Sequence, residues 1–258
     1  SNNVSSNSKI SGNYNNNNAE QNGGANNFQS SVSGSNVTGT YTNNKAENDG
    51  GANYFNKDVS GSTVTGTYIN NNAIAQGGAI YTIDYLSNCE FNGYFKDNTA
   101  DNGSAIYIRS NIQKSDFKGD FVANSANNLG TLFFFNQVTD CNFSGLFKNN
   151  KANKGGAAYF RTYAAANNFN GDFKNNNVTS GGGALYFDDF KISNSNFTGN
   201  FHALGDPLDL QRGHADTFFY SFIGLGHGHQ DLVYVENDFR AVALDNLHRL
   251  SSLEISVL

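Results

Sequence analysis

The sequence predicts an all-β fold, a parallel β-helix (β-solenoid) of about seven coils of 26 or 27 residues, and two observations support this. First, seven asparagines recur at spacings of 27, 27, 27, 26, 26 and 26 residues, each five residues after the glycine of an apolar-x-Gly-x-aromatic motif. Second, this unit is too short for a propeller blade and lacks the leucine register of a leucine-rich repeat. The recurring asparagines are Asn17, Asn44, Asn71, Asn98, Asn124, Asn150 and Asn176.

Three segments of each unit have the pattern of extended strands. The motif, for example Phe91 to Phe95, alternates at period two, which places its apolar residue, glycine and aromatic on one face. A second segment begins at Gly-Gly-Ala or a variant and continues into an aromatic residue, as in Gly77 to Tyr81. A third segment carries one apolar residue seven positions before the next motif glycine, as at Leu86. Three short strands per unit match one coil of a parallel β-helix.

Stacked coils place like residues in columns, and each column has a predicted role. A single coil cannot bury its own apolar face, so it must stack on copies of itself. The motif aromatics are expected to form a core stack, with tyrosine in the first three coils and phenylalanine afterwards. An asparagine at the same turn of every coil can bond side-chain amide to side-chain amide and to bent backbone. The seven asparagines are therefore predicted to form a structural ladder, and no catalytic residue is assigned.

The motifs resemble the paired Gly-Gly-Ala-Ile and Phe-x-x-Asn repeats of chlamydial polymorphic outer-membrane proteins and of adhesin-like surface proteins of methanogenic archaea. Gly77 to Ile80 matches one half of the pair, and Phe95 to Asn98 and Phe147 to Asn150 match the other. The resemblance covers roughly residues 1–201. It implies a right-handed parallel β-helix that is extracellular or at a cell surface, with adhesion as its role.

Composition bounds the expected partners. Residues 1–201 hold 13 Lys and Arg against 14 Asp and Glu, so no basic stripe indicates a nucleic-acid or anionic-membrane surface. No cofactor is predicted. A host or cell-surface glycan or protein is the expected partner, and end-to-end self-association is a second kind of contact to test. The chain has no initiator methionine, signal peptide or long apolar run, which favours a mature or excised fragment.

The two cysteines are predicted to be unpaired. Cys89 and Cys141 each lie four residues before a motif glycine, and Ser115 occupies the same place in the coil between them. Two coils separate their Cα atoms by about 9 to 10 Å, whereas a disulfide requires about 4.4 to 6.8 Å. Serine or asparagine fills this column elsewhere, so cysteine is expected to act as a small buried filler.

A polysaccharide lyase or hydrolase is the alternative to a non-enzymatic adhesin-like or structural stalk. Such a site needs clustered carboxylates. Asp120 and Asp172 share one column but lie two coils apart, and Asp188 and Asp189, the only adjacent acidic pair in the repeats, could contribute to a Ca²⁺ site. Histidine is absent before His202, which excludes a histidine general base from the repeats. Solvated surface aspartates are the favoured interpretation.

The composition changes abruptly after residue 201. Residues 202–258 hold all five histidines and the only proline, with eight acidic against three basic residues. An eighth motif copy, Phe197 to Phe201, is complete but has Leu204 where the ladder asparagine is expected. The predicted domains are therefore a β-helix over 1–201 and a C-terminal cap or appended module of uncertain origin over 202–258, since the open end of a solenoid must be covered.

Within that module, strands are predicted at Asp216 to Gly224 and Asp231 to Glu236, and a helix after Asn237. His227 and His229 are spaced so that both could bind one metal ion. No convincing third ligand accompanies them, so loop histidines are favoured over a metal site.

Overall fold

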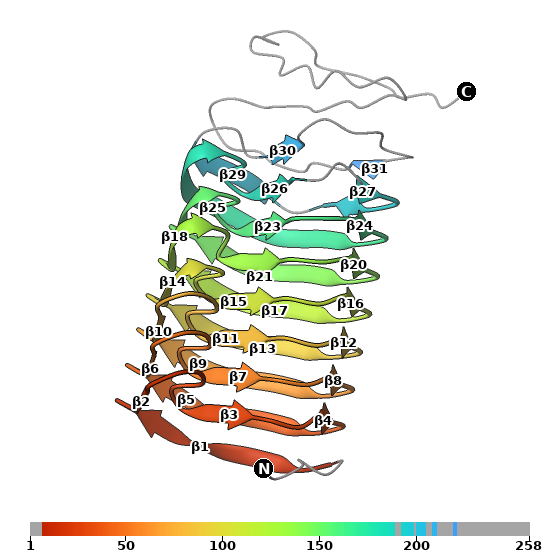
Figure 1. Cartoon of the computed structure of the whole chain (residues 1–258). Helices are drawn as coiled ribbons and strands as arrows, with labels where there is room; N and C mark the ends of the chain where they lie inside the picture. Colours follow the sequence, from red (N-terminus) through yellow and green to blue (C-terminus); the bar gives the residue numbers. More distant parts are fainter. Residues whose placement is uncertain (1–6, 189–191, 199, 205–207, 211–218, 221–258) are drawn as a thin grey trace, which may run out of the picture.

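The computed structural model is a stack of parallel β coils that rises along one axis, with like strands of successive coils above one another (Figure 1). The structure describes residues 7–188, 192–198, 200–204, 208–210 and 219–220, with side chains over 7–188 and 192–198. These residues form strands, turns and bends without a helix, so none of their segments is a helix that could cross a membrane. The predicted all-β solenoid of about seven coils is confirmed.

Each coil contains four strands where three were expected. The predicted motif strand is seven residues long in six coils and continues into a longer strand in the seventh. A short extra strand follows each of the first six ladder asparagines, because the chain returns to an extended conformation there and pairs with the next coil. The motif strands are β1 (Lys9–Asn15), β5 (Asn36–Thr42), β9 (Thr63–Ile69), β13 (Glu90–Lys96), β17 (Asp116–Val122), β21 (Asn142–Lys148) and β25 (Asn168–Gly181). The extra strands are β2 (Asn18–Ala19), β6 (Lys45–Ala46), β10 (Asn72–Ala73), β14 (Thr99–Asn102), β18 (Ser125–Leu129) and β22 (Lys151–Lys154).

The other two predicted segments form strands as expected. The segment after the glycine pair forms β3 (Asn26–Phe28), β7 (Asn53–Phe55), β11 (Ile80–Thr82), β15 (Ile106–Ile108), β19 (Leu132–Phe134), β23 (Ala158–Phe160), β26 (Leu185–Phe187) and β30 (Leu208–Leu210). The third segment forms β4 (Val32–Ser33), β8 (Val59–Ser60), β12 (Leu86–Ser87), β16 (Ile112–Gln113), β20 (Val138–Thr139), β24 (Ala164–Ala165) and β27 (Ile192–Ser193).

Parallel pairing in register places like residues above one another. β13 pairs with β17 so that Phe91 faces Phe117 and Gly93 faces Gly119. The motif strands and the extra strands belong to one 16-stranded sheet, joined through β25. The remaining two strand families form an eight-stranded and a seven-stranded sheet.

Each coil turns at three corners, and each corner has one residue with left-handed φ between 47° and 69°. The first corner precedes the motif strand, the second precedes the ladder asparagine, and the third is the first glycine of the glycine pair. First-corner residues are Asn7, Gly34, Gly61, Asn88, Lys114, Asp140, Ala166 and Asn194. Second-corner residues are Asn16, Asn43, Asn70, Asp97, Ala123, Asn149 and Asn175. Third-corner residues are Gly23, Gly50, Gly77, Gly103, Gly130, Gly155 and Gly182. The first and second corners of a coil are nine residues apart in every case.

The second glycine of the pair is required by space. A Cβ atom on Gly51 would lie 2.0 Å from the carbonyl oxygen of Gly78 in the next coil. The motif glycine is constrained similarly, since a Cβ on Gly93 would lie 2.0 Å from the Gly66 oxygen. Close coil stacking therefore accounts for both glycines.

The asparagine ladder is fully hydrogen-bonded in the middle coils. Asn98 Oδ1 accepts hydrogen bonds from the backbone N and the Nδ2 of Asn71, at 2.9 and 3.0 Å. Asn98 Nδ2 donates to the Tyr68 carbonyl at 2.9 Å and to Asn124 Oδ1 at 3.0 Å. The amide thus links three successive coils while being completely buried. Asn17, in the first coil, is exposed and donates to Asn44.

A second ladder follows the first corner. Each small polar side chain there accepts a hydrogen bond from the backbone N–H of the corresponding residue one coil earlier, as Ser62 Oγ does from Ser35 at 3.1 Å. Its hydroxyl donates to the carbonyl two residues before it, at 2.9 Å from Ser62 to Ser60. Both ladders thus satisfy backbone groups that the corners leave out of the strand pairing.

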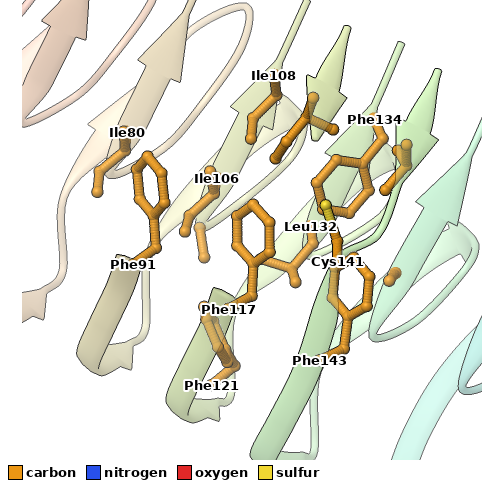
Figure 2. Close-up of a cluster of buried hydrophobic side chains, with 14 of the residues drawn as sticks. Ile80, Phe91, Ile106, Ile108, Phe117, Phe121, Leu132, Phe134, Cys141 and Phe143 are labelled. Atoms are coloured by element: carbon orange, nitrogen blue, oxygen red, sulfur yellow. The ribbon is translucent and has the colours of Figure 1, made fainter. Parts of the chain in front are cut away.

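Aromatic rings fill the core in columns. The predicted motif stack from Tyr14 to Phe173 is present, with ring centroids of adjacent coils 4.6 to 4.9 Å apart. A second column begins at Phe91 and meets the rings of the eight-stranded sheet edge-on, as between Phe117 and Phe134, whose planes are 78° apart (Figure 2). These contacts hold the sheets together across the interior.

In the eighth coil, Leu204 does not occupy the ladder position that the sequence predicted for it. β29 (Asn200–Leu204) pairs with β25, but Leu204 faces Asn177 and not the ladder residue Asn176. The second corner of this coil has one residue fewer, because His202 faces Lys174. Parallel pairing thus continues beyond residue 201 through β30, while β31 (Phe219–Tyr220) pairs with β28 (Asn196–Phe197). The predicted strand Asp231 to Glu236, the helix after Asn237 and most of the strand predicted at Asp216 to Gly224 lie outside the described residues.

Replacing Asn98 by alanine is expected to lower the free energy of unfolding by about 3 kcal/mol or more, because buried groups of three coils lose their partners. Asn17→Ala is the matched control, since it removes the same amide from an exposed site, and its cost should stay below about 1 kcal/mol. Urea denaturation followed by circular dichroism measures both. Equal losses of unfolding free energy for the two variants would contradict the expected contribution of the buried ladder to stability.

Candidate functional site

The carboxylates singled out in the sequence are not brought together. Asp120 faces Leu146, and Leu146 faces Asp172 one coil further on, as predicted. The Asp172 carboxylate pairs with Lys174 at 2.5 Å. Asp188 accepts a hydrogen bond from the Tyr159 hydroxyl at 2.5 Å, while Asp189 lies outside the described residues. Within the described part of the chain, no three His, Cys, Asp or Glu side chains are grouped so that they could hold a metal ion. His227 and His229 also lie outside it.

The cysteines have the predicted filler role. Both are buried and free. The Cys89 backbone N–H donates to Ser115 Oγ at 3.1 Å, and that of Cys141 donates to Asn167 Oδ1 at 2.9 Å. Their thiols lie 3.2 Å from the carbonyl oxygens two residues earlier, as a serine hydroxyl of this column would. Burial raises the pKa of the Cys141 thiol to about 12 and also raises that of Cys89.

The eight-stranded sheet carries an aromatic column on its outer face. From β7 to β26 the first and third side chains of each three-residue strand are buried, most of them in the core cluster, so the middle one points outward, because strand side chains alternate. We call these middle residues of six coils the outer aromatic column. They are Tyr54, Tyr81, Tyr107, Phe133, Tyr159 and Tyr186.

Stacking buries the outer aromatic column although it lies outside the core. None of its members is more than 6% exposed. Successive ring centroids are 4.6 to 5.4 Å apart, and the ring planes of each pair lie within 28° of parallel. The ring faces therefore contact one another, and mainly ring edges are directed toward solvent. This column is suited to rigidifying the sheet and cannot offer a ring face to a sugar.

One side of the column is formed by residues just before the third corner. Asp49, Gln76 and Asn102 pair as bridges there. In a later coil the Lys154 ammonium donates to the Tyr186 hydroxyl at 2.7 Å and lies 4.6 Å from the centre of that ring. A charged side chain thus contacts the hydroxyl of the last ring on this side. Burial raises the pKa of Asp49, while the hydrogen bond from the Gln76 backbone and the charge of Arg109 oppose this shift.

The other side is formed by residues two positions after each outer ring. We call Ile83, Arg109, Phe135 and Arg161 the arginine edge. The Arg161 guanidinium lies 3.9 Å over the Phe135 ring of the preceding coil. Arg109 likewise acts on the preceding coil, where its charge opposes the rise in the pKa of Tyr81 that burial causes. Both arginines are exposed, and neither has a carboxylate within 4.0 Å among the described residues.

The arginine edge was not among the predicted sites, although the sequence contains a signal for it. The segments after the glycine pair include three consecutive large residues, Leu132 to Phe134, and a strand can direct only two of them to the core. The middle aromatic had to face outward. Arg109 and Arg161 are also the only arginines in residues 1–201, and each follows an outer ring by two positions.

The native thiols should not react with Ellman's reagent at pH 8, because both are buried and their raised pKa values keep them protonated. Two thiols per chain should react once urea unfolds the coils. Cys89→Ser and Cys141→Ser are expected to fold normally, since serine already occupies this column. Rapid labelling of the native protein would show that the column opens.

Stability should fall at alkaline pH. Burial raises the pKa of Tyr41 and of Tyr81 from 10.0 to about 12, so folding favours their neutral forms. This contribution is fully present below pH 10 and is lost as the pH rises from about 10 to 12. Urea midpoints at pH 8, 10 and 11 measure the loss. Tyr81→Phe should weaken the dependence, since Phe133 occupies the same column; an unchanged pH profile would contradict this origin.

Comparison with known proteins leaves the family open: no protein-family model, no curated protein and no solved structure matches this chain. The similarity of its Gly-Gly-Ala-Ile and Phe-x-x-Asn motifs to chlamydial and archaeal surface-protein repeats therefore remains a prediction.

Proposed function

We propose that this protein is a non-enzymatic, cell-surface adhesin-like or structural stalk protein. Its β-solenoid would hold a repetitive outer surface away from the cell and bind a glycan or a protein there. The extracellular location and end-to-end self-association belong to this proposal as well. The motif resemblance implies the surface role, and the structural role of the repeated residues supports it.

One observation carries the proposal: the side chains that recur in every coil serve coil stacking. The ladder asparagines bond coil to coil, the motif aromatics stack in the core, and the corner residues supply left-handed turns. The outward positions of the motif strands differ between coils, as in the column that contains Thr67, Tyr94 and Asp120. This division is typical of a scaffold whose coils repeat at a fixed spacing while the outward residues that they carry differ.

The mechanism would be multivalent. Each coil rises by about 4.8 Å, so equivalent outward residues form a regularly spaced row along the stack. Weak contacts to a repetitive partner could then add up without a deep pocket. A rigid rod favours this, because little conformational freedom is lost when the second and third contacts form.

A glycan-array screen of the full chain, run beside a reducing-end assay on acidic polysaccharides, tests the proposal. Binding without cleavage is the expected result. Asp120→Asn and Asp172→Asn should leave binding unchanged, because these carboxylates lie two coils apart. Cleavage that disappears in either variant would establish the carbohydrate-active alternative and overturn the non-enzymatic assignment.

The location has its own test. Protease shaving of intact cells that express the native gene, followed by immunodetection of residues 7–188, should remove the protein from the cell surface. Complete protection in intact cells, with digestion after lysis, would contradict a surface role.

A further inference from the structure

We propose that the arginine edge binds an acidic polysaccharide that lies along the solenoid axis. This inference rests on the proposed adhesin role and names the class of partner. Arg109 and Arg161, the two arginines of residues 1–201, lie on the same edge of the eight-stranded sheet. The other cationic residues of 1–201 are 11 lysines.

These arginines occupy equivalent positions two coils apart. The Arg109 backbone N–H donates to the Thr82 carbonyl at 2.9 Å, and that of Arg161 donates to the Phe134 carbonyl at 2.9 Å. Two coils separate equivalent positions by about 9 to 10 Å. Phe135, in the coil between them, is partly exposed and is capped on one face by Arg161. The resulting row is cation, aromatic, cation.

The guanidinium groups are suited to carboxylate or sulfate. Arginine presents a planar fork that can bind such a group through two hydrogen bonds, which the ammonium of lysine cannot do. The five ion pairs found among the described residues all use lysine. Stabilisation by a salt bridge therefore does not account for the exposed guanidinium groups of Arg109 and Arg161.

Three acidic side chains lie near the edge and set its orientation: Asp84, which follows Ile83 and pairs with Lys57 at 3.5 Å, Asp49 and Asp188. The charge of Arg109 acts on Asp49 and opposes the rise in its pKa that burial causes. Asp188 follows Arg161 in the next coil and is held by the Tyr159 hydroxyl. Asp188 marks the C-terminal limit of the edge, because its charge would repel an acidic ligand. The binding row thus extends from Arg109 to Arg161.

A linear polymer fits this row better than a compact anion. A single phosphate or carboxylate could reach only one arginine, given the two-coil separation. A polysaccharide with an acidic group on alternate sugars can place one group at each arginine, with a sugar against Phe135 between them. The neighbouring ring faces are already stacked on one another, so recognition depends on charge and on this one ring.

Binding of the full chain to a hyaluronan decasaccharide, which carries one carboxylate per disaccharide, tests the inference. Calorimetry at low and physiological salt should show binding, while an uncharged chitin hexasaccharide should bind weakly. Arg109→Ala and Arg161→Ala are each expected to weaken hyaluronan binding by about tenfold or more, as for loss of a charge-assisted hydrogen bond. The double lysine variant, R109K/R161K, should recover part of this loss, because it keeps the charge and loses the fork.

A matched control separates this site from general charge attraction. Lys148→Ala with Lys151→Ala removes two exposed cations from β21 and β22 and should change the affinity by less than about twofold. Thermal melts should show that every variant folds, with at most a small decrease for Arg161→Ala, whose guanidinium stacks on Phe135. The inference would be overturned if the lysine control lost as much hyaluronan affinity as the arginine variants. It would also be overturned if the protein bound polyglutamate as tightly as hyaluronan.

The outcome also distinguishes this inference from the proposed function. Binding to other glycans on the array, without affinity for hyaluronan, would leave the adhesin role intact and remove the arginine edge as its site. Failure to bind any glycan or cell surface would contradict both.

Discussion

Stacking in register is the constraint on which the rest of the structure depends. Each coil must turn at the same three places as the coil beneath it, because every strand finds its hydrogen-bond partners one coil away. A corner displaced by one residue would turn a whole strand's core side chains outward. Left-handed residues fix the corners, and the small or amide side chains after them satisfy the backbone groups that the turns leave over.

The same register explains why the chain repeats residue types and not merely hydrophobicity. A ladder asparagine accepts a hydrogen bond from the asparagine of the preceding coil and donates one to the asparagine of the next coil, so the ladder works only if the column is uniform. Rings behave similarly, since parallel stacking at 4.6 to 4.9 Å follows from coils spaced by about 4.8 Å. The second ladder tolerates only small changes of residue type. Cys89 can replace serine there because its side chain is small and its thiol lies where the serine hydroxyl would be.

The columns could be predicted from spacing because equal intervals along the chain become vertical neighbours in a solenoid. This identified the Asn98 ladder, the Phe95 stack and the separation of Asp120 from Asp172. The extra strand after each ladder asparagine could not be found in this way, because a segment as short as Lys45–Ala46 has no measurable alternation and is extended only through its neighbours. Leu204 was misaligned because the eighth coil omits one corner residue, which breaks the equal interval. The arginine edge depends on which residue of a three-residue strand faces outward, and no motif encodes that directly.

The constant nine-residue interval between the first and second corners has a consequence for how such a chain can change in length. The other parts of the coil vary: the ladder asparagine precedes the third corner by six residues at Asn124 but by five at Asn150. Register irregularities occur in these same segments, at Ala100 to Asn102 and Ser125 to Leu129. Evolution can therefore lengthen the loop near the third corner without disturbing the stack. A peptide grafted at the exposed Asn127 and Asn128 would be held at a fixed height along the solenoid. A single residue inserted into a motif strand would instead shift every coil-to-coil contact of that strand.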